Sequence, residues 1–264
     1  MNQLEQKIKL DQHNPKKTLL IIITIIGAFI FSIIFLEISA LDMLKGLPKF
    51  VHFFFQNFFP PNLENIARYI PAVLDTVGYA IIATFLSSLI AFVFGILISE
   101  KTNKFKSIRL ICRGFISILR NIPFVIWGAL LVYIFGLGGI VGVLALILVT
   151  IGFLGKSYAE SIDEISGDKL EALQANGASY FQILLHGVIP QFVPAWINWT
   201  LFSFEINVRA SVVLGLVGAG GIGVLIDTNI NLFRYREALA IIIVVVSIIL
   251  LTEFLTNLLR KKLI

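Results

Sequence analysis

The chain has 264 residues, of which 58% are hydrophobic, only 14% are charged and one is cysteine, and its formal net charge is +5. Water-soluble domains carry about 25% charged residues, so a chain of this composition cannot cover a globular surface with groups that water solvates well. The same figures exclude an intrinsically disordered chain, a collagen-like repeat and a disulfide-rich scaffold, and the single cysteine, Cys112, argues against a cysteine-ligated metal site. The composition therefore predicts an integral membrane protein.

Apolar segments set the expected number of membrane spans. A hydrocarbon core about 30 Å thick needs roughly 20 apolar residues per helix. Residues 18–36 supply such a stretch without a charge and without a convincing signal-peptidase site, so we expect an uncleaved first span. The expected spans are Thr18–Leu36, Thr76–Ser99, Ile122–Phe135, Ile140–Gly155, Phe192–Val217 and Ala238–Leu255. The third and fourth are separated only by Gly136–Gly139, which predicts a tight hairpin. We therefore expect an all-α membrane protein with six transmembrane helices.

Lysine and arginine residues between the spans predict the orientation, because cytoplasmic loops carry an excess of them. With both termini in the cytoplasm, three basic clusters fall on the cytoplasmic side; they contain Lys7, Lys9, Lys16, Lys17, Lys101, Lys104, Lys106, Arg109, Arg113, Arg260, Lys261 and Lys262. The opposite side keeps Lys45, Lys49 and Arg68, which are balanced by Asp42, Glu64 and Asp75. Positive loops beside membrane lipid explain the basic excess, so we expect no nucleic-acid partner.

The expected spans divide the chain into four parts. These are a cytoplasmic N-terminus at 1–17, a first transmembrane helix at 18–37, an extracytoplasmic loop at 38–74, and a core of five transmembrane helices at 75–260 that includes a cytoplasmic loop at 156–191. Within the extracytoplasmic loop, the segment 45–61 is rich in phenylalanine and interrupted by proline. This pattern favours a helix lying in the membrane interface, and a substrate-docking segment is the weaker alternative.

Three patterns resemble motifs of other chemistries and are rejected on context. Gly218–Gly223 matches the dinucleotide-binding pattern G-x-G-x-x-G, but it follows a membrane span and has no β–α–β unit around it. Glycine there predicts close backbone packing or local unwinding instead. Gly155–Ser157 lacks the first glycine of a phosphate-binding loop, and the glycosylation sequon Asn198–Thr200 lies inside a span. The three histidines are scattered along the chain, so we expect no metal site and no cofactor.

The polar segment 156–191 is the most informative part of the sequence. Apolar residues recur at near-helical spacing over 170–185, and Gly177 divides the segment into two short helices. Asp168 is expected to cap the first helix, and Pro190 is expected to stop the second at the membrane. An amphipathic helix–glycine–helix segment with few lysines favours docking into a groove on a partner protein over lying on lipid.

This segment also resembles a motif of a known family, the EAA loop of ABC-importer permeases, whose pattern is E-A-A-x3-G-x9-I-x-L-P. Four residues match the pattern at the required spacing: Glu171, Ala172, Gly177 and Pro190. Three residues depart from it: Leu173 stands for the third alanine, Gly187 for the isoleucine and Ile189 for the leucine. The resemblance implies that the four matching residues belong to the loop that couples a permease to its ATPase.

Further stretches are similar to phosphonate-transport permeases in particular. They are Arg120–Pro123, Gly152–Glu160, Phe204–Arg209 and Val213–Gly223, within a similarity that covers about residues 70 to 260. The resemblance implies the type I ABC importer (MetI-like) permease fold in a bacterial cytoplasmic membrane, working by alternating access. It also implies ABC ATPase subunits on the cytoplasmic face, an extracytoplasmic solute-binding protein, and a second permease copy in a homodimer. ATP hydrolysis then belongs to the ATPase subunits, and this chain is not an enzyme.

Two charged residues inside a span, Glu205 and Arg209, allow two interpretations. A charge at the centre of a membrane helix costs about 2.5–3.5 kcal/mol on insertion scales, and their spacing of four residues places them on one helix face in the favourable order. They form either a self-compensating structural pair or part of a polar passage, where Arg209 and the nearby Asn207 meet a phosphonate anion. We assign Glu205, Asn207, Arg209 and Arg120 to the expected substrate pathway.

The expected function is therefore import of phosphonate or a related phosphorus oxyanion. Two alternatives stay open: a permease of the same class for another solute, such as phosphite or methionine, and a secondary transporter or channel. A secondary transporter should show internal repeats and intramembrane acids for ion coupling, and the sequence shows no convincing repeat.

Overall fold

The computed structural model describes residues 15–37 and 39–263, and the regular structure in these two ranges is entirely helical. The elements are α1 (Pro15–Phe35), α2 (Ala40–Phe58), α3 (Ile66–Ile98), α4 (Lys106–Asn121), α5 (Phe124–Phe135), α6 (Gly139–Asp163), α7 (Gly167–Ala175), α8 (Tyr180–Gln182), the π-helix η1 (Ile183–Val188), α9 (Ile189–Leu216), α10 (Ile222–Asn231) and α11 (Tyr235–Leu263). The chain separates into two compact units, Met1–Asn57 and Phe58–Ile264. The predicted all-α architecture is confirmed. Lys7 and Lys9 of the expected N-terminal basic cluster lie outside the described residues.

The first unit contains an apolar helix and an amphipathic one. Within α1, the stretch Lys17–Phe35 is long and apolar enough to cross a membrane, as predicted for the first span. In α2, Lys45, Lys49, His52 and Gln56 recur at intervals of four, three and four residues, which places them on one helix face. Leucine and phenylalanine side chains occupy much of the rest of this helix. A polar stripe on an otherwise apolar helix is the pattern expected of a helix lying in a membrane interface.

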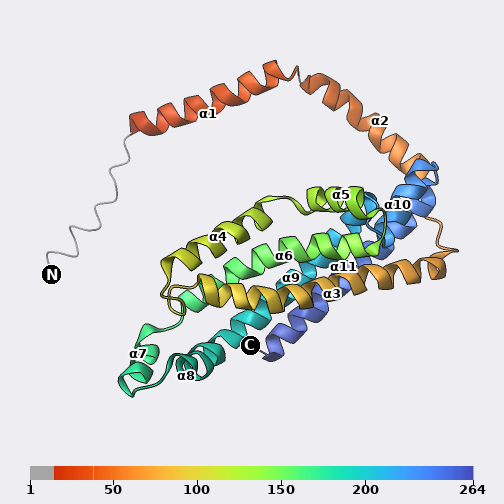
Figure 1. Cartoon of the computed structure of the whole chain (residues 1–264). Helices are drawn as coiled ribbons and strands as arrows, with labels where there is room; N and C mark the ends of the chain where they lie inside the picture. The colour runs from red at the N-terminus through yellow and green to blue at the C-terminus, as the bar shows by residue number, and fades with distance from the viewer. Residues whose placement is uncertain (1–14, 38, 264) are drawn as a thin grey trace. The chain divides into compact units, whose positions relative to one another are not determined.

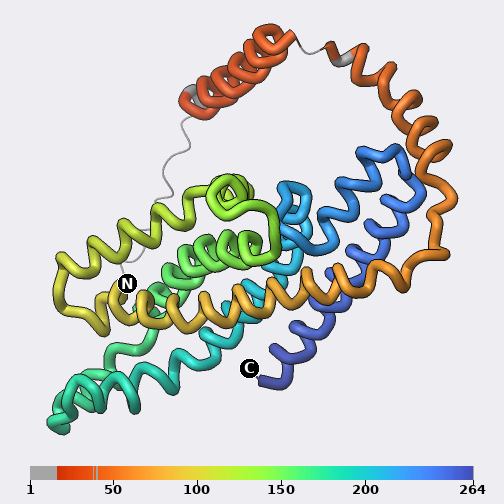
Figure 2. The backbone as a smooth tube through the Cα atoms, turned by 45° about the vertical axis from the view of Figure 1, so that its right-hand side comes forward, coloured from red at the N-terminus to blue at the C-terminus, as the bar shows by residue number. Residues whose placement is uncertain are grey.

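The second unit is a bundle in which α3, α6, α9 and α11 run side by side (Figures 1 and 2). α3 and α6 run in the same direction, because the Ser87 hydroxyl donates to the Ile147 carbonyl at 3.2 Å and the Ser99 hydroxyl donates to Asp163 at 2.6 Å. α9 runs antiparallel to both. The Tyr158 hydroxyl of α6 lies between the other two helices, 3.0 Å from the Ser88 hydroxyl and 2.7 Å from the Thr200 hydroxyl.

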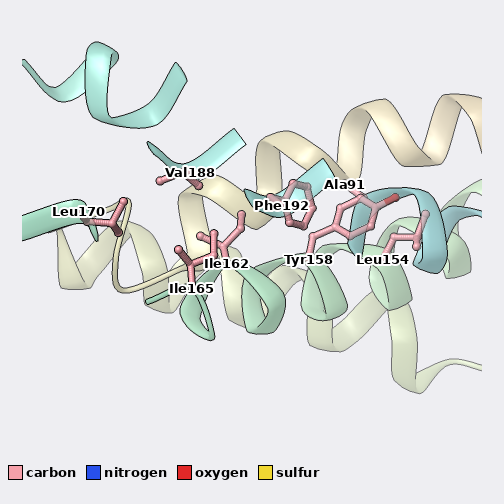
Figure 3. Packing of buried hydrophobic residues seen from close by; sticks show 8 residues of the cluster. All are labelled: Ala91, Leu154, Tyr158, Ile162, Ile165, Leu170, Val188 and Phe192. Carbon is pink, nitrogen blue, oxygen red and sulfur yellow. The ribbon is translucent and has the colours of Figure 1, made fainter. Parts of the chain in front are cut away.

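A cluster of buried side chains joins these helices to the segment that follows α6. Figure 3 shows its members: Ala91, Leu154, Tyr158, Ile162, Ile165, Leu170, Val188 and Phe192. The Tyr158 ring meets the Phe192 ring edge-on with centroids 5.2 Å apart, an arrangement that aromatic pairs favour. Since Leu170 belongs to α7 and Val188 to η1, the hydrophobic core extends beyond the membrane helices into this segment.

Fewer helices meet the length and apolar character of a membrane span than the six spans that we expected. In the described part of the chain, four helices are long and apolar enough to cross a membrane: α1, α3, α6 and α11. α5 has only 12 residues, about 18 Å, so it is not the independent third span that we expected. α4 and α5 meet at a bend of 86° and count together as a fifth crossing at most. The expected fifth span is α9, which has 28 residues but contains Glu205 and Arg209. By length and composition the count is therefore four to five, against the six expected.

The glycine-rich stretch after α9 makes a sharp reversal. Three of its glycines have positive φ: Gly218 at 88°, Gly220 at 82° and Gly221 at 74°. Glycine adopts this conformation at little cost because it has no Cβ. α9 and α10 then approach closely, since a Cβ added to Gly215 would lie 2.6 Å from the Cα of Gly223. The prediction of local unwinding and close backbone packing is confirmed.

Several element boundaries differ from the prediction. α6 continues to Asp163 instead of ending at Gly155, so the first part of the segment that we expected to be a loop, residues 156–163, belongs to the bundle. α4 occupies the basic stretch that we expected to be a loop, and α10 follows the glycine-rich stretch. α4 matters for the site, because it carries Arg120 to the side of α6.

Candidate functional site

Residues 167–188, which we name the coupling hairpin, comprise α7, a turn, α8 and η1. Glu171 and Ala172 lie on α7 with exposed side chains. Gly177 lies in the turn with a φ of 79°, so the predicted division into two helices at this residue is confirmed. A Cβ added to Gly177 would meet no atom within 4 Å. Glycine is therefore required there by the backbone conformation and not by lack of space.

Two of the residues that depart from the EAA pattern face each other in the coupling hairpin. A Cβ added to Gly187 would lie 2.9 Å from Cδ1 of Leu173 and 2.9 Å from Cδ2 of Leu170. The larger side chain at 173, where the pattern has alanine, thus fills space that the smaller residue at 187, where the pattern has isoleucine, leaves free. The two departures compensate each other in volume, and α7 packs directly on η1.

The coupling hairpin begins at the same end of the second unit as the basic loop between α3 and α4. Asp163, the last residue of α6, accepts hydrogen bonds from the Ser99 hydroxyl at 2.6 Å and from the Glu100 backbone N–H at 2.8 Å. The Lys101 ammonium group donates to the carbonyl oxygen of Ile165. These bonds hold the end of α3 to the start of the hairpin, so the second basic cluster and the hairpin share one end of the bundle (Figure 1).

Pro190 does not stop the second helix, contrary to our expectation. Helical turns continue through α8, η1 and α9, and Pro190 lies in the first turn of α9. A proline lacks the N–H that bonds to the carbonyl four residues earlier, and its ring crowds that carbonyl. The π-helix Ile183–Val188 provides a wider turn directly before Pro190, and Gln191 Nε2 donates to the Gly187 carbonyl at 2.7 Å. The helix accommodates the proline by widening.

Asp168 is not the N-cap of α7, which is a second correction. Ser166 occupies the N-cap position and the helix begins at Gly167, so Asp168 lies within the first turn. A carboxylate in the first turn still stabilises the helix, because it interacts favourably with the positive end of the helix dipole.

Glu205 and Arg209 pair with α11 instead of with each other. Glu205 is buried; it accepts hydrogen bonds from Arg260 Nη2 at 2.6 Å and from the Thr256 hydroxyl. Arg209, whose side chain is 47% exposed, pairs with Glu253 at 3.0 Å. Each charge of α9 is thus compensated by a partner on α11, and the two ion pairs tie these helices together.

Asn207 faces a different part of the bundle from Arg209. Its Oδ1 accepts a hydrogen bond from the Thr150 hydroxyl at 2.9 Å, and its Nδ2 donates to the Thr84 hydroxyl oxygen at 2.8 Å. Two residues of helix rotate a side chain by about 200°. The structure therefore places Asn207 between α3 and α6, and Arg209 against α11.

Arg120, near the end of α4, lines two cavities. The α6–α9 cavity has a volume of about 150 Å³; Thr150, Ser203 and Asn207 also line it, together with apolar side chains of α5, α6 and α9. The α4–α6 cavity has a volume of about 370 Å³, and its other lining residues are Ile98, Arg113, Ile116, Ser117, Lys156, Ala159, Glu160 and Asp163. Within residues 15–37 and 39–263, the Arg120 guanidinium has no hydrogen-bond or ion-pair partner. Of the four expected pathway residues, the structure brings Arg120 and Asn207 to one cavity.

The sequence analysis missed four residues that the structure places at these sites. Ser203 lines the α6–α9 cavity, and its spacing of four from Asn207 was the available signal. Gly152 lies against the backbone of Arg120. Glu253 is the partner of Arg209, and Arg260 is the partner of Glu205. The sequence signal for Glu253 was an acidic residue inside the last apolar helix. Arg260 gave no such signal, because in the sequence it is only one charge of a basic terminal cluster.

Comparison with known proteins assigns the chain to a family. The family described as "Binding-protein-dependent transport system inner membrane component" matches residues 91–264. The phosphite transport system permease protein PtxC of Stutzerimonas stutzeri is 31% identical over 240 residues, which cover 89% of this chain and 87% of that protein. The phosphate-import permease protein PhnE of Mycolicibacterium smegmatis is 35% identical over 206 residues, covering 78% of this chain but only 39% of that longer protein.

Solved structures show the same fold. A chain from the inward-facing MetNI methionine ABC transporter superposes with a TM-score of 0.67 at 18% sequence identity, covering 76% of this chain and 98% of that one. A chain from an amino acid ABC transporter superposes with a TM-score of 0.63 at 18% identity. The fold is therefore the MetI-type permease fold that the resemblance implied. The chain belongs to the family of inner membrane components of binding-protein-dependent transport systems, and it is a permease subunit of an ABC importer.

Proposed function

We propose that this permease subunit imports a phosphorus oxyanion, phosphonate or phosphite, through the cytoplasmic membrane by alternating access. The observation that carries the proposal is the similarity over most of the chain to a phosphite permease, together with that to a phosphate-import permease. Relatives named for methionine are similar over a smaller share; one of them is 29% identical over 56% of this chain. Arg120, which lines a cavity of the bundle and pairs with no acid among the described residues, agrees with an anionic cargo.

The coupling hairpin is the proposed docking site of the ATPase subunit. Glu171 and Ala172 are exposed on α7 and so are accessible to a partner, while Leu170 is buried in the core and holds α7 to the bundle. Gly177 sets the turn, and Pro190 marks the point where the hairpin passes into α9. Movement of the hairpin would therefore reach the pathway through a continuous helical connection.

The orientation that we propose places both termini and the coupling hairpin in the cytoplasm. The hairpin shares one end of the bundle with the basic cluster at 101–113, and cytoplasmic loops are enriched in lysine and arginine. A solute-binding protein then delivers the anion from the opposite side. A second copy of this chain completes the pathway in the proposed homodimer.

Reconstitution tests this function. The chain is assembled with its ATPase and solute-binding protein in proteoliposomes, and ATP-driven uptake of labelled phosphite, methylphosphonate, phosphate and methionine is measured. We expect phosphite or methylphosphonate to be imported and to stimulate ATP hydrolysis. Import of methionine alone would assign the chain to a different solute, and uptake driven by a proton gradient without ATP would contradict the transport mechanism.

A further inference from the structure

We infer that Asp163 is a positioning residue that fastens the coupling hairpin to the loop between α3 and α4, residues 99–105, so that movement of the hairpin reaches α4 as well as α9. The inference rests on the proposed docking of the ATPase subunit on this hairpin, and it adds a second route from the docking site into the bundle. Three observations carry it: a carboxylate in an unfavourable place, reciprocal bonds between the two segments, and ion pairs that continue the connection into α4.

Asp163 lies where a negative charge is unfavourable for the helices themselves. It is the last residue of α6, and its hydrogen bond with the Ser99 hydroxyl places it beside the end of α3 as well. The C-terminus of a helix carries a partial negative charge, which repels a carboxylate. Neither α3 nor α6 has a basic residue in its last turn. An acid at 163 is therefore explained by the bonds that it makes and not by helix stability.

These bonds are reciprocal. One carboxylate oxygen of Asp163, Oδ1, accepts the Ser99 hydroxyl at 2.6 Å and two successive backbone N–H groups, those of Glu100 at 2.8 Å and Lys101 at 3.4 Å. Hydrogen bonds to a charged acceptor are stronger than neutral ones. The Lys101 ammonium group in return donates to the carbonyl oxygen of Ile165, whose side chain is buried in the core. Each segment thus holds the backbone of the other, between residues 63 and 64 positions apart.

Ion pairs continue this connection from the loop into α4. The Glu100 carboxylate lies 3.7 Å from Arg109 Nη2 and 3.5 Å from Arg113 Nη2. Arg109 also donates to the Asn103 carbonyl at 2.7 Å, and Arg113 donates to the Ile98 carbonyl at 3.4 Å. A single exposed ion pair contributes little to stability. Together, however, these contacts from two arginines fix the first half of α4 on the loop.

A cavity separates the loop from much of the coupling hairpin. It has a volume of about 320 Å³; Lys101 and Lys104 line it from the loop, and Gln174, Tyr180 and Leu184 line it from the hairpin. Over this stretch, space lies between the two segments. The bonds at the start of the hairpin are therefore the connection through which a displacement of the hairpin reaches the loop.

The far end of α4 is held against α6. A Cβ added to Gly152 would lie 2.8 Å from the backbone nitrogen of Arg120, so the two helices are in direct contact there. α5 follows after a bend of 86°. The coupling hairpin thus has two continuous connections to the bundle: one through η1 into α9, and one through Asp163 into α4 and α5.

Labelling of single cysteines in the reconstituted transporter, in a Cys112→Ser background, tests the second route. Ser117→Cys reports on α4 at the α4–α6 cavity, and Asn198→Cys reports on α9 at a cavity beside α11. A non-hydrolysable ATP analogue should change the rate of reaction with a water-soluble thiol reagent several-fold at both positions. Asp163→Ala should remove the change at 117 and keep the change at 198, a result that a general loss of folding would not produce.

Two neighbouring substitutions are the controls for Asp163→Ala. Asp163→Asn should keep most of the change at 117, because the amide oxygen still accepts hydrogen bonds in the same geometry. Glu164→Ala removes the next acid in the chain, which is exposed, and should behave like the wild type.

A reducible cross-link restores the connection without Asp163. Lys101→Cys with Asp163→Cys removes both side chains that join the segments, and a short bifunctional thiosulfonate reagent links the two cysteines. Uptake of anion per ATP hydrolysed should fall about tenfold in the unlinked double variant, the factor that corresponds to one hydrogen bond to a charged group. It should recover on cross-linking and fall again on reduction. The same molecules are compared before and after reduction, so this arm decides the case if Asp163→Ala does not fold.

The wild type separates this inference from the proposed function. A wild type without ATP-driven uptake of phosphite, methylphosphonate or phosphate contradicts the proposed function. The role of Asp163 is overturned if the wild type imports one of these anions and reduction of the cross-link leaves uptake per ATP unchanged. It is equally overturned if Asp163→Ala keeps the change at 117, or if the nucleotide produces no change at 117 in a transporter with Asp163 intact.

Discussion

Asn207 and Arg209 are separated by a single residue of α9, yet they contact different helices. Asn207 bonds to Thr84 and Thr150, while Arg209 reaches Glu253 on α11. The sequence identified both as polar residues in an apolar helix, which is a reliable sign of function or internal pairing. The sequence could not show that Asn207 and Arg209 contact different helices, because the neighbours of each helix face depend on the packing of segments far apart in the chain.

Gly177→Val should abolish substrate-stimulated ATP hydrolysis in the assembled transporter while the protein still inserts into the membrane. A φ of 79° costs an L-residue about 1–2 kcal/mol, and a β-branched side chain tolerates it least. The turn would rearrange and displace Glu171 and Ala172 from the ATPase. Phosphate release in proteoliposomes measures the effect, and Glu171→Lys should produce the same loss by reversing a charge at that surface.

The control for this prediction is Gly167→Val. Gly167 also has no atom within 4 Å of an added Cβ, but its φ lies outside the left-handed region. Equal substrate-stimulated ATP hydrolysis by the two valine variants would contradict the proposed role of the turn at Gly177 in coupling.

Glu205→Ala should destabilise the protein, and adding Arg260→Ala should restore most of the loss. The two side chains are 8% and 23% exposed. Removing one partner of a buried pair costs roughly 3–5 kcal/mol because the other charge stays buried, and the partial exposure of Arg260 places this pair at the low end. Thermal unfolding in detergent measures the four variants of the double-mutant cycle.

The comparison for this cycle is Glu205→Ala with Arg209→Ala. This double variant should not recover stability, because it leaves Arg260 and Glu253 without their partners. Recovery by this second double variant would mean that Glu205 and Arg209 compensate each other directly.

At the scale of elements, long apolar runs predicted the long helices of the bundle, whereas the shorter helices α4 and α10 were missed. α4 carries Lys106, Arg109, Arg113 and Arg120 at intervals of three, four and seven residues, which is the spacing of one polar helix face. The prediction interpreted these cations only as a cytoplasmic loop. α10 was missed because it has just ten residues after a glycine-rich stretch. The passage of the helix through Pro190 depends on a π turn, for which the sequence carries no simple signal.

Gly187→Ile should uncouple ATP hydrolysis from substrate, and adding Leu173→Ala should restore coupling. The single change places a large side chain where methyl groups of Leu170 and Leu173 already lie 2.9 Å from the point that a Cβ at 187 would occupy. Overpacking of this kind costs about 1–3 kcal/mol and would lift α7 from η1. The double variant has the residues of the EAA pattern at both positions, so their volumes again match. The rate of proteolysis within the coupling hairpin provides a second measurement, and equal protection of the single and double variants would contradict the compensation.

At the scale of the whole molecule, composition predicted an integral membrane protein, and the placement of the charges predicted an orientation. The EAA-like motif predicted the family. Composition and charge act through local rules, namely span length and the positive charge of cytoplasmic loops. The sequence alone does not predict the two cavities, because one is formed by α3, α4 and α6 and the other by α4, α5, α6 and α9. Both depend on close approaches such as that of Gly152 to Arg120. The ion pairs between α9 and α11 join residues more than 40 positions apart, and a single sequence does not indicate such pairs.

Cysteine labelling tests the orientation. In a Cys112→Ser background, Glu64→Cys should react with an impermeant thiol reagent in intact cells, and Lys104→Cys should react only after lysis. Both residues are exposed, unlike the neighbouring Asn103, which is 9% exposed and donates to the Leu97 carbonyl at 2.7 Å. Reaction at 104 and not at 64 in intact cells would invert the chain and place the coupling hairpin outside.

The π-helix η1 has a mechanical consequence for the motion that the coupling hairpin passes on. In an α-helix one residue corresponds to about 100° of rotation and 1.5 Å of rise, and a π turn holds surplus chain of this kind. If η1 tightened to an α-helix, α9 would therefore rotate relative to the coupling hairpin and also shift along its own axis. Because Ser203 and Asn207 lie on α9, which follows η1, this rotation would change the direction of both side chains together.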